Sequence, residues 1–110
     1  MAEDSIPPVK LLITYSVRPA REEAYYRFMS GEFLPGAQSI GLVMVEAWRT
    51  AWGDYPDRLM GMVADNPEML EQILNSQHWR EMKHKLAEYV KDYQEQVVPY
   101  RNGFQFLKTG

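Results

Sequence analysis

One unbroken run of residues, 42–65, constrains the fold of this chain most, because its ends are composed like strands and its middle like a turn. Apolar residues dominate both 42–51 and 59–64, and each stretch has the length of a strand. Residues 53–57 combine glycine, proline and aspartate, which is typical of a turn longer than the tight two-residue kind. The run therefore predicts a β-hairpin.

A strand and then a helix are predicted before this hairpin. Apolar and polar side chains alternate over 9–17, which is the period of a strand with one strongly buried face. Pro19 suits the first turn of a helix that continues to Met29, and Pro35 with Gly36 closes or kinks that helix.

A helical region and a last strand are predicted after the hairpin. Asn66 caps a short helix over 67–74, and Ser76 caps a second segment from 77 to about 97. Residues 101–108 then form the last strand. The order βαββαβ predicts a ferredoxin-like α+β fold with a four-stranded antiparallel sheet. We expect one such domain over 9–108, preceded by a flexible N-terminal arm, 1–8.

Composition excludes several classes of protein. The chain has 110 residues, no cysteine and a net charge of -3, so disulfides, cysteine-bound metals and attraction to nucleic acid are not expected. RNA-recognition domains share the element order but need stacking aromatics on the third strand, and 58–64 has none. No apolar run approaches the roughly 20 residues of a membrane span. We expect a cytoplasmic protein.

The strands are apolar on more than one face. A four-stranded sheet covered by helices on one side leaves its other side open to water, yet Leu12 and both faces of 42–51 are apolar. The sequence therefore predicts a homodimer that forms by sheet-to-sheet packing.

Aromatic and polar residues come together on the first strand of the hairpin. Strand spacing places Glu46, Trp48, Thr50 and Trp52 on one face, where they would line a cavity for a flat apolar ligand. The alternative is that the tryptophans are core or dimer contacts and that Glu46 pairs with an arginine such as Arg58. Three further aromatic residues are expected to line the same cavity: Tyr15, Tyr26 and Trp79.

His78 stands at the start of the long helical segment, at the edge of its apolar stripe. It is the histidine best placed to act as a general base, and Glu46 is the second candidate catalytic residue. The alternatives for His78 are an axial haem ligand or an ordinary solvated side chain. No cofactor is predicted, and His84 is expected in solvent.

Short motifs give the chain a family resemblance. Residues 33–41, 48–53 and 76–79 resemble the NIPSNAP-like branch of the dimeric α+β barrel superfamily, and 9–108 resembles that superfamily as a whole. The resemblance implies two ferredoxin-like subunits that join their sheets, with a cavity in each subunit between sheet and helices. Relatives include cofactor-independent monooxygenases of polycyclic aromatic hydroquinones and haem-degrading enzymes. Those monooxygenases place Trp, Tyr, Asn and Arg in the cavity, and no asparagine of this chain aligns with that role.

Two functional hypotheses follow. The first is a cavity protein that binds an apolar or aromatic small molecule, with cofactor-independent monooxygenation as its candidate activity. The second is a non-catalytic structural or interaction module of the same fold. Trp48 and His78 facing one cavity would favour the first hypothesis, and burial of Trp48 between two sheets would favour the second.

Overall fold

The structure is a computed structural model and describes residues 8–49 and 57–100. Most of the expected N-terminal arm, most of the hairpin turn with Thr50 and Trp52, and the expected strand 101–108 lie outside the described residues. The elements, in chain order, are β1 (Val9–Val17), α1 (Glu22–Phe28), α2 (Leu34–Ser39), β2 (Val43–Arg49), β3 (Arg58–Val63), α3 (Pro67–Leu74), α4 (Gln77–Leu86) and β4 (Val90–Pro99).

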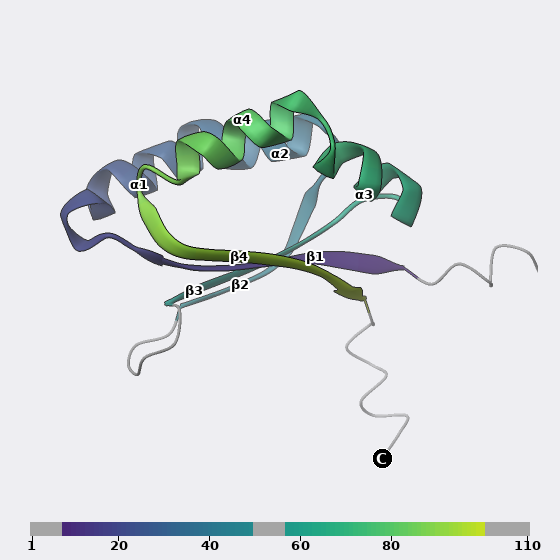
Figure 1. Cartoon of the computed structure of the whole chain (residues 1–110), viewed down its shortest axis with the longest axis horizontal. Helices are drawn as coiled ribbons and strands as arrows, with labels where there is room; N and C mark the ends of the chain where they lie inside the picture. Colours follow the sequence, from purple (N-terminus) through teal and green to yellow (C-terminus); the bar gives the residue numbers. More distant parts are fainter. Residues whose placement is uncertain (1–7, 50–56, 101–110) are drawn as a thin grey trace, which may run out of the picture.

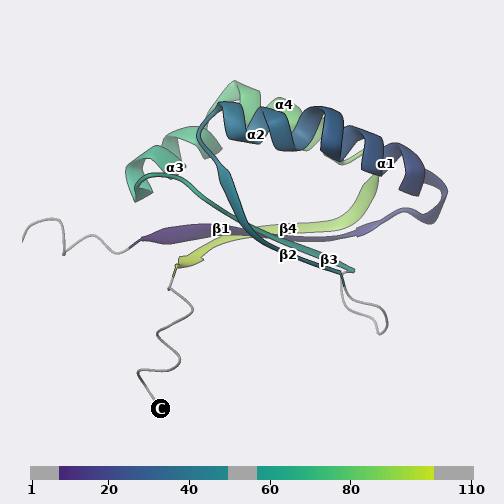
Figure 2. The same ribbon diagram turned by 180° about the vertical axis from the view of Figure 1, so that it is seen from behind.

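The strands form one antiparallel sheet in the order β2-β3-β1-β4. The predicted alternation over β1 is confirmed, because its side chains are buried at every second position from Leu11 to Val17. Figures 1 and 2 show helices α1 to α4 on one side of the sheet, and no helix of the described residues lies on the other side. The ferredoxin-like α+β architecture predicted from the sequence is thus the observed one.

The predicted helix starts in the second half are confirmed. The Asn66 side chain accepts a hydrogen bond of 2.7 Å from the Met69 amide at the start of α3. The Ser76 hydroxyl accepts one of 3.2 Å from the Trp79 amide at the start of α4. Each bond satisfies one of the amide groups that a first helical turn leaves without a partner.

The long second helix predicted over 77–97 is wrong. α4 ends at Leu86, and Val90–Pro99 is the fourth strand, which pairs with β1 along nearly its whole length. Tyr93 and Val97 are four residues apart, and this spacing suits one face of a strand as well as one stripe of a helix. Pairing with β1 favours the strand over the helix for this segment, since β1 would otherwise be an unpaired edge strand of the sheet.

The first helix does not close at Pro35. A 3₁₀ turn (Pro19–Arg21) leads into α1, and a π turn (Met29–Phe33) joins α1 directly to α2. Pro35 is the second residue of α2 and directly follows the π turn, where the regular α-helical hydrogen bonding is already interrupted, so its missing amide hydrogen is tolerated. The chain leaves the helix only at Gly41, whose φ of 103° is readily adopted by glycine.

A β-bulge in β2 changes which residues share a face. Met44 pairs with Met62, but Glu46 pairs with Gly61, so Val45 is an extra residue in β2. Met44 therefore faces the helices, whereas Glu46 and Trp48 face away from them. Glu46 and Trp48 share one face, as strand spacing predicts, but it is the face turned away from the helices.

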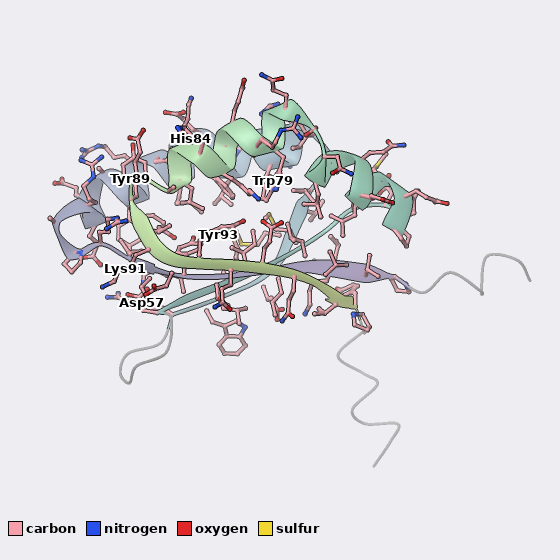
Figure 3. All side chains as sticks on the ribbon, in the orientation of Figure 1. Asp57, Trp79, His84, Tyr89, Lys91 and Tyr93 are labelled. Atoms are coloured by element: carbon pink, nitrogen blue, oxygen red, sulfur yellow. The ribbon has the colours of Figure 1, made fainter. Side chains whose placement is uncertain are left out.

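The core fills the space between the helices and the inner face of the sheet. Phe33 and Trp79 are in aromatic contact at 5.9 Å between centroids, and Phe28 stacks on Tyr89 at 5.1 Å. Figure 3 shows Trp79 and Tyr93 in this layer and His84 on the outer side of α4. None of the helices in the described part of the chain is long and apolar enough to span a membrane.

Candidate functional site

A cavity of about 460 Å³ lies between α1 with the π turn and the part of the sheet formed by β1, β3 and β2. This volume is within the range of ordinary small-molecule sites. Most of its lining is apolar, and π turns recur at functional sites. The lining residues are Tyr15, Tyr25, Tyr26, Met29, Ser30, Leu34, Met44, Ala47, Trp48, Arg49, Arg58, Leu59 and Met60.

Two tyrosines form the deepest polar contact of the cavity. The Tyr15 hydroxyl oxygen lies 2.7 Å from that of Tyr25, and both side chains are buried. Burial raises the pKa of both hydroxyls, and the proximity of Tyr25 raises that of Tyr15 further. One hydroxyl proton joins the two oxygens, and the other has no acceptor among the described residues. Because the raised pKa keeps both hydroxyls protonated, the pair is neutral, and its second proton can be donated in a hydrogen bond.

Arg58 brings a positive charge into the same cavity. It is the first residue of β3, and only 8% of its surface is exposed. Its Nη2 donates a 2.7 Å hydrogen bond to the Tyr26 hydroxyl, and its guanidinium lies 5.7 Å from the centroids of both the Tyr25 and the Tyr26 rings. These contacts fix the guanidinium against the tyrosines at one end of the cavity.

Carboxylates balance this charge from the rim. Glu22 Oε2 lies 3.7 Å from Arg58 and 3.7 Å from Arg49, so one carboxylate serves two guanidinium groups. Asp57 lies 3.6 Å from Arg58 and also accepts a 3.1 Å hydrogen bond from the Val17 amide. Since Glu22 is about half exposed and loosely paired, an anionic or strongly accepting ligand oxygen can compete with it for Arg58.

The structure brings three of the expected site residues to this cavity. Tyr15 lies on its floor, Tyr26 accepts the hydrogen bond from Arg58, and Trp48 borders it. Trp48 is 65% exposed, and its pairing with Leu59 places its side chain on the outer face of the sheet. The tryptophan thus faces away from the helices and contributes only to the rim.

Glu46 and Trp79 lie outside the lining of the cavity. Glu46 is on the outer face of the sheet, where Oε2 lies 2.6 Å from Lys10 Nζ. Its partner is therefore Lys10 and not Arg58. Trp79 is fully buried in the helix layer, and its Nε1 has no hydrogen-bond partner among the described residues. Neither position brings the side chain to the tyrosines.

His78 is not in the cavity either. It is exposed on α4 and borders a separate hollow of about 140 Å³, together with Glu32, Glu81 and Lys85. This hollow is small and charged, so it does not fit the large apolar macrocycle of haem. His78 and Trp48 do not share a cavity, and a catalytic role for His78 or Glu46 stays a prediction that their positions do not support.

The sequence analysis missed Arg58, Met29 and Met60 as site residues and left Tyr25 out of the site. The signal for Arg58 was present: it has the same strand parity as the two methionines that follow at 60 and 62, so it faces inwards with them. An arginine that points to the same side of a strand as buried methionines is itself buried, and a buried charged group needs partners inside the protein.

Comparisons with known proteins give a match at the level of structure alone. No family model matches the sequence, and no curated protein matches it. A NIPSNAP family protein from Agrobacterium tumefaciens has a TM-score of 0.62 and 12% identity, covering 87% of this chain and 95% of that one. A NIPSNAP domain protein from Burkholderia xenovorans has a TM-score of 0.63 and 11% identity, with 87% and 96% covered.

A candidate antibiotic biosynthesis monooxygenase from Nitrosomonas europaea also matches, with a TM-score of 0.63, 11% identity and 89% and 94% of the two chains covered. The matches span nearly the whole length of these proteins. At such identities they establish the fold, which is a ferredoxin-like α+β fold, and function has to be argued from the site.

Proposed function

On this ferredoxin-like fold, we propose that the protein binds an aromatic or otherwise apolar small molecule in the cavity between sheet and helices. The observation that carries the proposal is the cluster of Arg58 with Tyr15 and Tyr25 at one end of an otherwise apolar cavity of about 460 Å³. Such a cavity takes up a flat apolar body by exclusion of water, and its donors orient a carbonyl or phenolate oxygen.

We further propose that the bound molecule is oxidised without a cofactor. The likeness to a candidate monooxygenase motivates this step. The described lining contains no histidine and no carboxylate, so the substrate has to ionise through its own acidity, helped by the positive charge of Arg58. In the overall reaction a ring CH₂ group and O₂ give a carbonyl group and water. The substrate loses four electrons, and one oxygen atom goes to each product.

Two measurements test this proposal in sequence. Native mass spectrometry of the purified protein, followed by titration with an anthrone or a hydroquinone, tests binding. An oxygen electrode then compares oxygen consumption with that of a heat-killed control. Arg58→Met should weaken binding at least tenfold and abolish any oxygen uptake, whereas Arg27→Met should keep both, because Arg27 is an exposed arginine of α1 outside the cavity lining. Absence of binding would refute the cavity proposal, and binding without oxygen uptake would refute the oxidation step alone.

The outer face of the sheet supports the second proposal, a homodimer. Exposed apolar side chains of β2 lie there. Figures 1 and 2 show that none of the described helices covers this face of the sheet. Val43 is 56% exposed and Trp48 65% exposed, with Val45 beside them on the same edge strand. Burial of these side chains against a second sheet would remove them from water. The same surface would serve the interaction-module hypothesis.

Light scattering tests the homodimer. Trp48→Glu should convert a dimer into a monomer, because it places a charge within the proposed contact. The matched control is Met69→Glu, since Met69 is also an exposed apolar residue but lies on α3 in the helix layer. A wild-type protein that is monomeric at micromolar concentration would refute this proposal.

A further inference from the structure

A second hollow adjoins the cavity on the side of α2. It has a volume of about 290 Å³ and lies between α2 and β2, where β2 forms the edge of the described sheet. Its lining residues are Leu34, Ala37, Gln38, Leu42, Val43, Met44 and Met62. Leu34 and Met44 also line the main cavity, so these two side chains separate the two spaces.

The two spaces differ in chemistry. The main cavity has its buried donors, Arg58 and the paired tyrosines, on its β1, β3 and α1 walls. The exposed Arg49 also lines it, opposite Arg58 and at the end of β2 away from Met44. The second hollow has one polar lining residue, Gln38, and that residue is exposed on α2. A molecule that lies in both spaces would therefore have a polar end and an apolar end.

The residues between the two spaces can move aside. Met44 is unbranched and only half-buried, and thioether side chains change rotamer at low cost. Met44 also directly precedes the bulge at Val45, where β2 lacks regular pairing. Leu34, on the other side, is half-buried in the first turn of α2.

We infer that the ligand of this protein is elongated, with an aromatic, oxygen-bearing head at Arg58 and an unbranched apolar arm that passes between Leu34 and Met44 into the second hollow. Alkyl- or acyl-substituted phenols and hydroquinones are the class that this arrangement fits. The inference rests on the proposed function, since it needs the head of the ligand to occupy the main cavity.

A series of hydroquinones with a methyl, a butyl or an octyl substituent tests the inference by isothermal titration calorimetry. The affinity should rise by roughly 3- to 4-fold for each buried CH₂ group until the second hollow is full. Leu34→Phe should remove most of this gain, measured as the ratio of the octyl affinity to the methyl affinity in the variant against the same ratio in the wild type. Leu34→Ala should preserve or increase the gain, because it widens the passage.

Ala37→Leu gives an independent check, since Ala37 lines only the second hollow, and the added methyl groups occupy that space. It should weaken the octyl compound at least tenfold relative to the methyl compound. Ser30→Ala is the matched control, because Ser30 lines only the main cavity, and it should not change the dependence on chain length. Thermal unfolding of each variant verifies that it is folded.

The outcomes separate the two proposals. If the methyl compound does not bind, the proposed function fails and the inference fails with it. If the methyl compound binds but the affinity does not depend on chain length, the inference is overturned and the proposed function stands. A dependence on chain length that Leu34→Phe and Ala37→Leu both leave intact would also overturn it, because the arm would then lie elsewhere.

Discussion

The hydroxyl oxygens of Tyr15 and Tyr25 lie 2.7 Å apart in the interior of the protein, one contributed by β1 and the other by α1. This contact ties the sheet to the helix layer at the polar end of the cavity. It also has a thermodynamic consequence, because burial raises the pKa of both hydroxyls above the ordinary value of 10.0, and it does the same for Tyr93.

We predict that alkaline pH destabilises the protein through these tyrosines. Above pH 10.0 the unfolded chain loses the three phenolic protons while the folded protein keeps them. The unfolded state then binds fewer protons, so the free energy of unfolding falls as the pH rises further. Urea melts above and below this pH measure the fall, and Tyr15→Phe should reduce it. Titration of all 7 tyrosines near pH 10 in the folded protein would contradict the prediction.

Arg58 should matter for stability as well as for binding. Arg58→Met leaves the Tyr26 hydroxyl and the Asp57 carboxylate without their guanidinium partner, which should lower the free energy of unfolding by about 1–3 kcal/mol. Arg49→Met is the control, because the side chain of Arg49 is mostly exposed and its pair with Glu22 should contribute less than about 0.5 kcal/mol. Equal losses in the two variants, measured by urea denaturation, would contradict this difference.

Gly61 lies beneath the pair of Lys10 and Glu46 on the outer face of the sheet. A Cβ at this position would lie 2.7 Å from Glu46 Cγ and 3.1 Å from Lys10 Cδ, so Gly61→Ala displaces the pair and should cost about 1–3 kcal/mol. Gly31→Ala should instead stabilise by about 0.5–1 kcal/mol, since no described atom outside its immediate neighbourhood lies within 4 Å. Thermal melts that show the same sign for both variants would refute this prediction.

Asp92 has a φ of 58°, which is unusual for a residue other than glycine. It lies in the bulge of β4, where two residues, Asp92 and Tyr93, stand opposite Tyr15. Asp92→Asn should change stability by less than about 0.5 kcal/mol, because asparagine tolerates this conformation, whereas Asp92→Val should lose about 1–2 kcal/mol. Chemical denaturation that finds the two variants equally stable would show that the strain is relieved elsewhere.

Local signals in the sequence were sufficient for most of the fold. Capping residues, a proline in a first turn and the alternation over 9–17 act within a few neighbours, so Asn66, Ser76 and β1 could be predicted directly. The boundary between α4 and β4 could not, because Tyr93 and Val97 fit both periods. Only the need of β1 for a second neighbour resolves that ambiguity.

The site was less predictable than the fold. Tyr15 could be identified because the inward face of its strand is plain in the alternation over 9–17. Tyr26 is about half exposed, and it was singled out for its hydroxyl group and not for its position on the helix. The sequence left open whether Trp48 faces the cavity or a second sheet, because the extra residue at Val45 inverts the alternation of β2 and no residue there signals a bulge. The position of Arg58 beside the tyrosines depends on cross-strand pairing between β1 and β3, which a single sequence does not specify.

The π turn at Met29–Phe33 makes the number of residues in this segment a factor that sets which side chains of the helix reach the cavity. Each residue of an α-helix rotates the next by roughly 100°, so a single deletion in this segment would turn α1 with Tyr25 and Tyr26 relative to α2. Related chains that differ by one residue here would present a different set of side chains to the same space. Insertions and deletions in this segment are therefore a direct route by which this fold can acquire new ligand preferences while its core composition is unchanged.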